Sequence, residues 1–480
     1  METGPGIGRD EWASREDENV EPTLAARALA AFNRLPAAVR YAVIVIPIAA
    51  LPFVTSDQYK LQVGLDTLVF VILALGLNVT LGWAGMLDLG YVAFFGFGAY
   101  VYAWLASDQF GVHWQAHWAV PAAVLAAGAL GLVLGLTSWR VSGDYFAIVT
   151  LFFLQIMLTL AINIDSPDFA FWEIPPEWHI TNGPNGISTV DPFTFFGAEL
   201  GSLDAYYFVA VGAIVLLLAA MYLVNNSRVG RGWRSQREDV LAAELMGMRV
   251  RWLKLSAFAY GAAVAGLAGP ILAASHGAVF PVDFDLTVLI TVYAMVILGG
   301  LGSLAGVMLG AIVLNVALEV LREPGDASIV FFLIVLVVTL AVIRPLWVWA
   351  AIAVATLVFG VAVHAVVEQV WPEGVAGTTA GGTRLDELAE DWVILPADPI
   401  TWNRIMFLVL IAGVLWLTVL RGWRRLVVFP PVLYLAVCMW ESAMLPQPAI
   451  ARYILIGAML IGLMAARPQG LLGTQRVEIV

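Results

Sequence analysis

The sequence predicts an all-α polytopic membrane protein. Hydrophobic residues make up 61% of its 480 residues, charged residues only 12%, and the mean hydropathy is +0.87. A soluble domain usually carries about 25% charged residues. This chain therefore has too little polar surface to cover itself in water, which excludes a soluble enzyme, a nucleic-acid binder and a disordered protein.

Hydrophobic runs recur along the whole chain. About 14 of them could cross a membrane, where a spanning helix needs about 20 apolar residues. They are 41–55, 63–82, 85–105, 118–138, 143–164, 205–224, 255–275, 285–301, 305–321, 328–343, 346–367, 405–420, 427–445 and 450–466. Several are short or interrupted by glycine, so we expect some broken or re-entrant helices.

The charge distribution orients these spans. Segment 225–254 is rich in arginine, so the positive-inside rule places it in the cytoplasm. Segments 165–204 and 368–402 are acidic and are expected outside. Counting spans from these anchors puts both termini in the cytoplasm, including the polar tail 1–40. The net charge of −12 is thus a sum over two faces of a membrane.

Several kinds of chemistry are not expected in this chain. The single cysteine, Cys438, allows no intramolecular disulfide and no cysteine metal site. His113 and His117 have no nearby Cys, Asp or Glu to complete a metal site, so we predict none. Lys60 and Lys254 are each followed by Leu and lack the glycine cradle of a Walker A loop. We therefore predict a non-enzymatic chain without cofactors, in which any ATP and Mg belong to partner subunits.

Segment 225–254 contains a candidate docking helix. Residues 238–248 begin with two acids and end near a glycine, which suits a short helix. Such a helix could sit in a groove of another protein; the alternative is a solvated loop that only sets orientation. The candidate docking residues are Arg237, Glu238, Asp239, Leu241, Ala242, Ala243, Glu244 and Gly247.

Two glycine-rich breaks mark a candidate translocation pathway. Glycine permits close helix packing or a break that turns backbone polar groups toward a cavity. The candidate residues are Asn78, Gly85, Asp88, Gly90, Tyr91, Gly299, Gly300 and Gly302. Asp88 could line the pathway or cap a broken helix. Segments 85–105 and 305–321 both run outward, which indicates either an internal duplication or chance, because glycine is common in membrane helices.

Several stretches carry a resemblance to a known family. LAAELMG at 241–247 resembles the EAA loop of ABC-importer permeases, with Leu241 at the usual Glu position. Six further stretches, in family order, are similar to LivM-type permeases of branched-chain amino acid ABC importers. They are LGLNVTLGWAGMLDLGYVAFFGFGAY at 75–100, SGDYFAIVTL at 142–151, TNGPNGI at 181–187, KLSAFAYGAAVAGLAG at 254–269, VILGGLGSLAGVMLGA at 296–311 and ARPQGLLG at 466–473.

The resemblance divides the chain into a core and an insertion. It covers roughly residues 60–325 and 449–473 and implies a permease core of about 10 spans, formed by 41–326 together with the final helix. Segment 327–448 is then an insertion of four spans with the external acidic loop 368–402, and 449–480 holds the final core helix and tail. We expect a peripheral appendage that contacts lipid or a partner, with a direct transport role as the alternative.

The resemblance also implies a function. It describes a permease subunit in the inner cell membrane that moves branched-chain or related amino acids inward by alternating access. Its implied partners are a second permease, two ATPase subunits and an external solute-binding protein. Three alternatives stay open: a permease for urea or short amides, an ion-coupled secondary transporter or channel, and a structural or sensor protein.

Overall fold

The computed structural model describes residues 32, 35–139, 141, 143–164, 180–195, 197–343, 345–375, 392–396, 398–420, 422–444, 448–466 and 470–472. These residues form two compact units. Unit 1 comprises 1–286, 299–309 and 471–480, and unit 2 comprises 287–298 and 310–470. Residues 1–31, 33 and 34 of the predicted tail 1–40 lie outside the described residues, and so do the acidic stretches 165–179 and 376–391.

Unit 1 is a bundle of long helices joined by short segments. Its α-helices are α3 (Ala37–Ala49), α4 (Leu51–Val54), α5 (Gln58–Leu77), α6 (Tyr91–Leu105), α7 (Ala116–Gly135), α8 (Asp144–Asn163), α9 (Leu203–Asn226), α10 (Arg228–Glu238), α11 (Val240–Leu245) and α12 (Val250–His276). Its π-helix is η1 (Asn78–Trp83), and its 3-10 segments are η2 (Leu136–Trp139), η3 (Gly183–Asn185) and η4 (Pro281–Phe284).

Helix α12 is the central helix of unit 1 and packs against α5, α6 and α7. Small residues make this packing close. A β-carbon at Gly98 of α6 would lie 2.7 Å from the Cα of Gly266, and one at Gly266 would collide with Ala127 of α7. In a bilayer, helices associate mainly through such close contact, because burying apolar carbon away from lipid gains little. The glycines and alanines of α12 therefore hold the core together.

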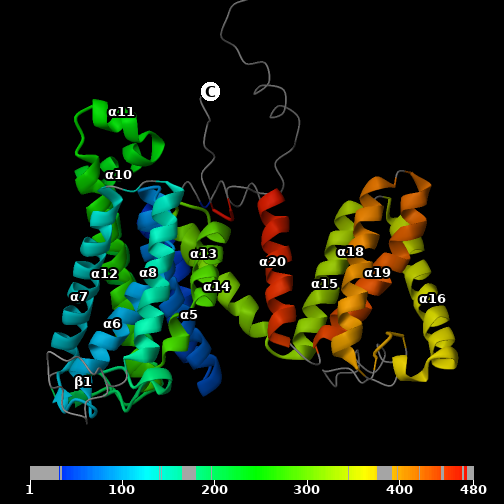
Figure 1. Cartoon of the computed structure of the whole chain (residues 1–480), viewed down its shortest axis with the longest axis horizontal. Coiled ribbons are helices and arrows are strands. Elements are labelled where there is room, and N and C mark those ends of the chain that lie inside the picture. The colour runs from blue at the N-terminus through cyan, green and yellow to red at the C-terminus, as the bar shows by residue number, and fades with distance from the viewer. Residues whose placement is uncertain are drawn as a thin grey trace, which may run out of the picture. The chain divides into compact units, whose positions relative to one another are not determined.

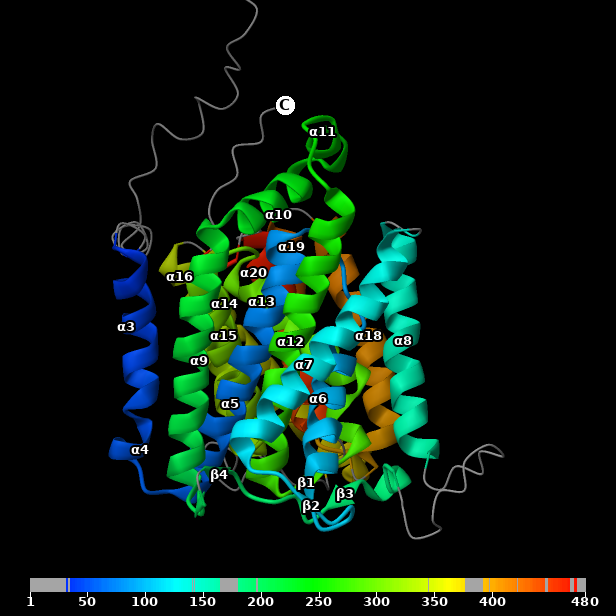
Figure 2. The same cartoon turned by 90° about the vertical axis from the view of Figure 1, so that its left-hand side faces the viewer.

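The two ends of unit 1 differ in structure. Helices α10 and α11 lie at one end, and the short strands lie at the other (Figures 1 and 2). The strands are β1 (Ala106–Ser107), β2 (Val112–His113), β3 (Ile187–Ser188), β4 (Thr194–Phe195), β5 (Ala198–Glu199) and β6 (Ala278–Val279). They pair antiparallel as β1–β2, β3–β6 and β4–β5. The basic segment 225–254 and the described part of 165–204 are thus at opposite ends, as the predicted topology requires.

Unit 2 is also helical. Its helices are α13 (Leu286–Gly299), α14 (Leu304–Val320), α15 (Pro324–Val342), α16 (Leu346–Val370), η5 (Pro372–Gly374), α18 (Pro399–Val419), α19 (Trp423–Met444) and α20 (Pro448–Ala466). The first and last residues of α13 and the start of α14 belong to unit 1. Figure 1 shows α15, α16, α18 and α19 side by side, and α19 packs against the other three.

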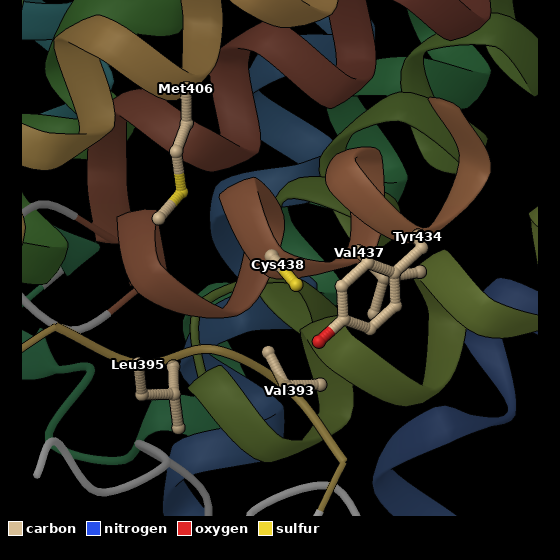
Figure 3. Close-up of a cluster of buried hydrophobic side chains, with 6 residues drawn as sticks. All are labelled: Val393, Leu395, Met406, Tyr434, Val437 and Cys438. Atoms are coloured by element: carbon tan, nitrogen blue, oxygen red, sulfur yellow. The ribbon is translucent and has the colours of Figure 1, made fainter. Parts of the chain in front are cut away.

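A small core holds these four helices and the segment before α18 together (Figure 3). Its buried members are Val393, Leu395, Met406, Tyr434, Val437 and Cys438. The Tyr434 hydroxyl donates to the Trp392 carbonyl at 2.8 Å, and the Trp392 indole donates to the Leu357 carbonyl at 3.0 Å. Only 11% of the apolar window of α18 is buried, which leaves most of its surface available to lipid.

The predicted all-α polytopic membrane fold is confirmed. Within the described residues, nine helices are long and apolar enough to cross a membrane, and several shorter apolar helices accompany them. The strands are two residues long, and their pairing connects loops at one end of unit 1. The total number of spans, their orientation and the boundaries of the insertion stay predictions.

Candidate functional site

The first glycine-rich break lies between the end of the α5–η1 helix and the start of α6. Helix α5 continues as the π-helix η1, and the chain leaves the helical conformation after Trp83. Gly85 has φ +70°, a conformation that side chains disfavour. The Met86 N–H donates back to the Thr80 carbonyl at 2.9 Å. The chain then crosses to Tyr91, where α6 begins.

Asp88 lies in this crossing and is almost completely buried. Its carboxylate accepts a hydrogen bond from the Gly90 N–H at 3.0 Å, and Gly90 is the N-cap residue of α6. Next to it, the Thr150 hydroxyl accepts from the Leu89 N–H at 2.9 Å. This bond reaches the N-cap residue and not the N–H groups of the first turn of α6, which has no side-chain cap, so both interpretations of Asp88 stay predictions. Tyr91 is fully buried, with its hydroxyl against Gly76.

The second break meets the first. The Gly302 N–H donates to the Asn78 side-chain oxygen at 2.8 Å, and the Trp83 indole donates to the Gly302 carbonyl at 3.2 Å. Gly302 has φ +90°, and a β-carbon there would lie 3.2 Å from Nη1 of Arg237. The sequence marked the two breaks separately; the structure brings them into direct contact around Gly302.

Residues next to Gly302 complete the turn between α13 and α14. The Gly300 carbonyl accepts from the Ser303 N–H at 3.2 Å, and the backbones of Gly299 and Gly306 are too close for a β-carbon. The Gly299 carbonyl also accepts from the Leu472 N–H at 3.1 Å. The tail that follows α20 is therefore attached to this turn.

The predicted docking helix over 238–248 is wrong in extent. Glu238 ends α10, Asp239 is extended, and α11 spans only Val240–Leu245. The Asp239 carboxylate caps α11 by accepting from the N–H groups of Leu241 and Ala242 at 2.8 and 3.0 Å. A capping residue adopts a non-helical conformation, so Asp239 separates α11 from the preceding helix α10. Gly247, with φ +79°, follows the end of α11, as expected.

Helix α10 was not predicted, and one of its faces packs against unit 1. Gly230, Trp233 and Gln236 are buried along it. The Trp233 indole donates to the Leu253 carbonyl at 2.9 Å, and its ring stacks on Trp83 with 6.4 Å between centroids. The three-residue spacing of these buried positions within an arginine-rich segment is the signal that could have revealed this helix.

The end of α10 contacts the first break directly. The Gln236 side-chain amide donates to the Ala84 carbonyl at 3.1 Å, and the Arg237 guanidinium donates to the Gly82 carbonyl. Carbonyls at the C-terminal end of a helix have no amide partner within that helix. Gln236 and Arg237 therefore cap the α5–η1 helix from a different element.

The predicted docking residues divide into two groups. Arg237 points into unit 1, and Ala243 is buried. The other six are exposed: Glu238, Asp239, Leu241, Ala242, Glu244 and Gly247. Two exposed apolar residues outside that list join them, Leu245 at 80% and Met246 at 82% exposure. Sequence reasoning also missed Trp83, Trp233 and Gln236.

At the opposite end of unit 1, His113 has carboxylate neighbours that the sequence analysis did not expect. Its Nδ1 lies 2.7 Å from Asp191, and its Nε2 lies 3.7 Å from Asp108. The expectation failed because Asp191 is distant in sequence and because the β1–β2 hairpin folds Asp108 back. Possible ligand atoms of the three residues lie within 4.8 Å of one another. The hydrogen bond to Asp191 raises the pKa of His113 above its ordinary value.

An apolar cavity of about 240 Å³ lies between α6, α8, the residues just before η3, and η4. Aromatic and aliphatic side chains dominate its lining, among them Phe97, Trp104, Leu154, Met157 and Phe284. A cavity with this lining accommodates aliphatic groups and offers few hydrogen-bond partners to a small polar molecule.

Comparisons with known proteins agree with this architecture. Residues 61–343 match the family described as the permease component of the branched-chain amino acid transport system. The chain is 35% identical over 303 residues to the high-affinity branched-chain amino acid transport system permease protein LivM of Escherichia coli, covering 58% of this chain and 67% of that protein. It is 34% identical over 311 residues to LivM of Salmonella typhimurium, covering 60% of this chain and 69% of that protein.

A more distant relative is the permease protein LivH of Salmonella typhimurium, 23% identical over 259 residues, covering 52% of this chain and 80% of that protein. No solved structure matches the chain. The family match covers more than half of the chain and includes both glycine-rich breaks and α10–α11. This protein therefore belongs to the branched-chain amino acid transport permeases, as a multi-pass membrane protein of the LivM type.

Proposed function

We propose that this chain is the permease subunit of an ABC importer in the inner cell membrane and moves branched-chain or related amino acids inward by alternating access. Separate ATPase subunits bind ATP and Mg and drive the cycle. A second permease, related to LivH as this chain is to LivM, and an external solute-binding protein complete the assembly. No covalent chemistry takes place in this chain.

The observation that carries this proposal is the exposed surface of α11. Leu241 is 66% exposed, and Leu245 and Met246 are more exposed still. An apolar surface on a short capped helix, at the basic end of unit 1, fits a groove in a partner protein. The helix before it, α10, contacts both glycine-rich breaks through Trp83 and Arg237. A partner bound to α11 would thus act on the part of the membrane domain where helices are interrupted.

The apolar cavity supports an amino acid with an aliphatic side chain over urea. Its polar atoms are few, and Tyr100 and Thr181 supply hydroxyl groups at its edge among apolar carbons. This lining suits an aliphatic side chain, whereas urea has no apolar part and would leave most of its polar groups unpaired there. The ammonium and carboxylate groups of an amino acid would be bound outside the cavity.

The test is reconstitution with the cognate ATPases and second permease. Leu245→Glu places a charge in the proposed ATPase contact, so we expect the ATPases no longer to co-purify and ATP-dependent leucine uptake to be lost. Leu245→Met keeps an apolar side chain and is expected to behave as wild type. Normal uptake by Leu245→Glu would refute the α11 contact, and a wild-type chain that never co-purifies with an ATPase would refute the ABC function.

The substrate and the energy source need separate measurements. Competition of labelled leucine uptake by unlabelled isoleucine, but not by urea, is the expected result. Uptake that follows an ion gradient without ATP would instead identify a secondary transporter. Membrane binding or signalling without any solute uptake would identify a structural or sensor protein.

A further inference from the structure

We propose that Arg237 and Gln236 form a latch that couples α10 to the two glycine-rich breaks, so that movement of the docking segment is delivered to the translocation pathway. This inference rests on the proposed function, because it assigns positioning residues to the same ATP-driven cycle. It moves Arg237 out of the ATPase contact, where the sequence placed it, and into the permease interior.

The first step is that α10 is firmly attached to the membrane helices. Trp233 is 1% exposed, its indole donates to Leu253 and Ser256 of α12, and its ring stacks on Trp83. Tyr260 adds a further ring contact at 6.1 Å. A large aromatic residue held on several sides leaves α10 little freedom to move without moving η1.

The second step is that α10 forms hydrogen bonds to the end of η1. Gln236 and Arg237 donate to the carbonyls of Ala84 and Gly82, which face away from any amide of their own helix. The positive guanidinium also lies at the C-terminal end of the α5–η1 helix, where a cation is favoured. The Arg237 side chain packs against Gly85, where a β-carbon would lie 2.8 Å from its Cγ. Gln236 and Arg237 therefore bind backbone carbonyls, and these hydrogen bonds do not depend on the side chains of the break.

The third step carries the link to the second break. Asn78 accepts from the Gly302 N–H, and Trp83 donates to the Gly302 carbonyl, so η1 holds that peptide on both sides. Nη1 of Arg237 lies beside Gly302 as well. A displacement of α10 would thus reach both breaks through a continuous network of hydrogen bonds to backbone groups.

The experiment compares two arginines of α10 in the reconstituted full complex. Arg237→Met keeps the length of the side chain and removes its donors. The control is Arg234→Met, because Arg234 also donates to a helix-end carbonyl, that of Asn225, at 3.0 Å, but has no contact with either break among the described residues. ATPase co-purification, ATP hydrolysis and leucine uptake are measured for each.

We expect Arg237→Met to co-purify with the ATPases and to hydrolyse ATP, while leucine uptake per ATP hydrolysed falls about tenfold or more, the effect expected from losing one charged hydrogen bond. Arg234→Met should keep the wild-type ratio. An unchanged ratio in Arg237→Met would overturn the latch. So would loss of ATPase co-purification in a folded Arg237→Met, because Arg237 would then belong to the docking surface.

A second pair of variants protects the test against misfolding. Gln236→Leu removes the other donor without a charge change and should lower the same ratio. Arg237→Lys retains a cation and a donor and should recover part of the coupling that Arg237→Met loses. If Gln236→Leu is normal and Arg237→Lys is as defective as Arg237→Met, the latch is wrong.

The two proposals fail in different ways. If the ABC function is wrong, the wild-type chain shows neither ATPase binding nor ATP-dependent uptake. If only the latch is wrong, the wild type is active, and substitutions of Arg237 and Gln236 leave leucine uptake per ATP hydrolysed unchanged.

Discussion

At the scale of single residues, the junction between the two breaks depends on backbone conformations that only glycine adopts readily. Gly302 has φ +90° and is held through both its N–H and its carbonyl. The sequence does not reveal that Gly302 has this conformation, because most glycines in membrane helices serve close packing.

Replacing Gly302 with alanine should destabilise the protein by about 1–3 kcal/mol, because the new side chain would hold a strained φ and approach Arg237. Thermal unfolding of the purified protein measures this as a lower midpoint. Gly212→Ala is the matched control, because Gly212 is in α9 with open space around it, and alanine is favoured in a helix. Equal midpoints for the two variants would contradict the proposed strain.

His113 predicts a pH dependence at the other end of unit 1. Asp191 raises its pKa, so the protonated ring is favoured in the folded state. The contribution is complete below the unfolded pKa of about 6.5 and is lost as the pH rises through the higher folded value. The Val190 and Asp191 amides, which donate to Gly277 and Ala106, report on this attachment.

Hydrogen exchange of those amides, corrected for intrinsic rates, should show more protection at about pH 6 than at about pH 8.5. Asp191→Asn removes the charge and should abolish most of the difference. Asp108→Asn should have a smaller effect, because Asp108 is farther from the ring and more exposed. The same pH difference in Asp191→Asn as in wild type would show that another group titrates.

At the scale of elements, the proposed docking segment consists of two helices in different environments. Helix α10 is buried along one face and contacts the breaks, whereas α11 is exposed and is stabilised by its own cap. A helix of six residues is marginal without such help. The capping carboxylate of Asp239 is therefore expected to decide whether α11 is formed before a partner binds.

Asp239→Ala should cost α11 about 1 kcal/mol, seen as faster hydrogen exchange over 240–246 and weaker ATPase co-purification. Asp239→Asn keeps a side-chain oxygen for the cap and should stay close to wild type. If both variants lose the ATPase equally, the charge of Asp239 contacts the partner directly and the cap is not the cause.

At the scale of the whole molecule, the chain carries a second helical unit in addition to unit 1. The family match ends at residue 343, so it includes α15, which the sequence analysis assigned to the insertion. Two deletions, each removing four spans, test whether the insertion begins at residue 327 or after residue 343. Deleting 327–447 keeps α20 as the final helix, and deleting 345–467 keeps α15 in its place.

We expect the deletion of 327–447 to retain leucine uptake, because α20 leads directly to Leu472, whose N–H is bonded to Gly299. The deletion of 345–467 should lose it. Uptake and membrane insertion are measured for both. Activity in the second deletion alone would place the boundary after α15, and inactivity of both well-inserted chains would give the insertion a direct transport role.

The sequence by itself determined the membrane class, the two glycine-rich breaks, the basic segment 225–254 and the family. Composition, charge and local motifs carry that information, because hydrophobic length and charge bias act on each segment separately. Tertiary structure alone decided that Gly302 meets Asn78, that Arg237 turns inward, and that Asp191 meets His113. These contacts join residues between 78 and 224 positions apart, and no local pattern specifies which distant backbone carbonyl or carboxylate a side chain will find.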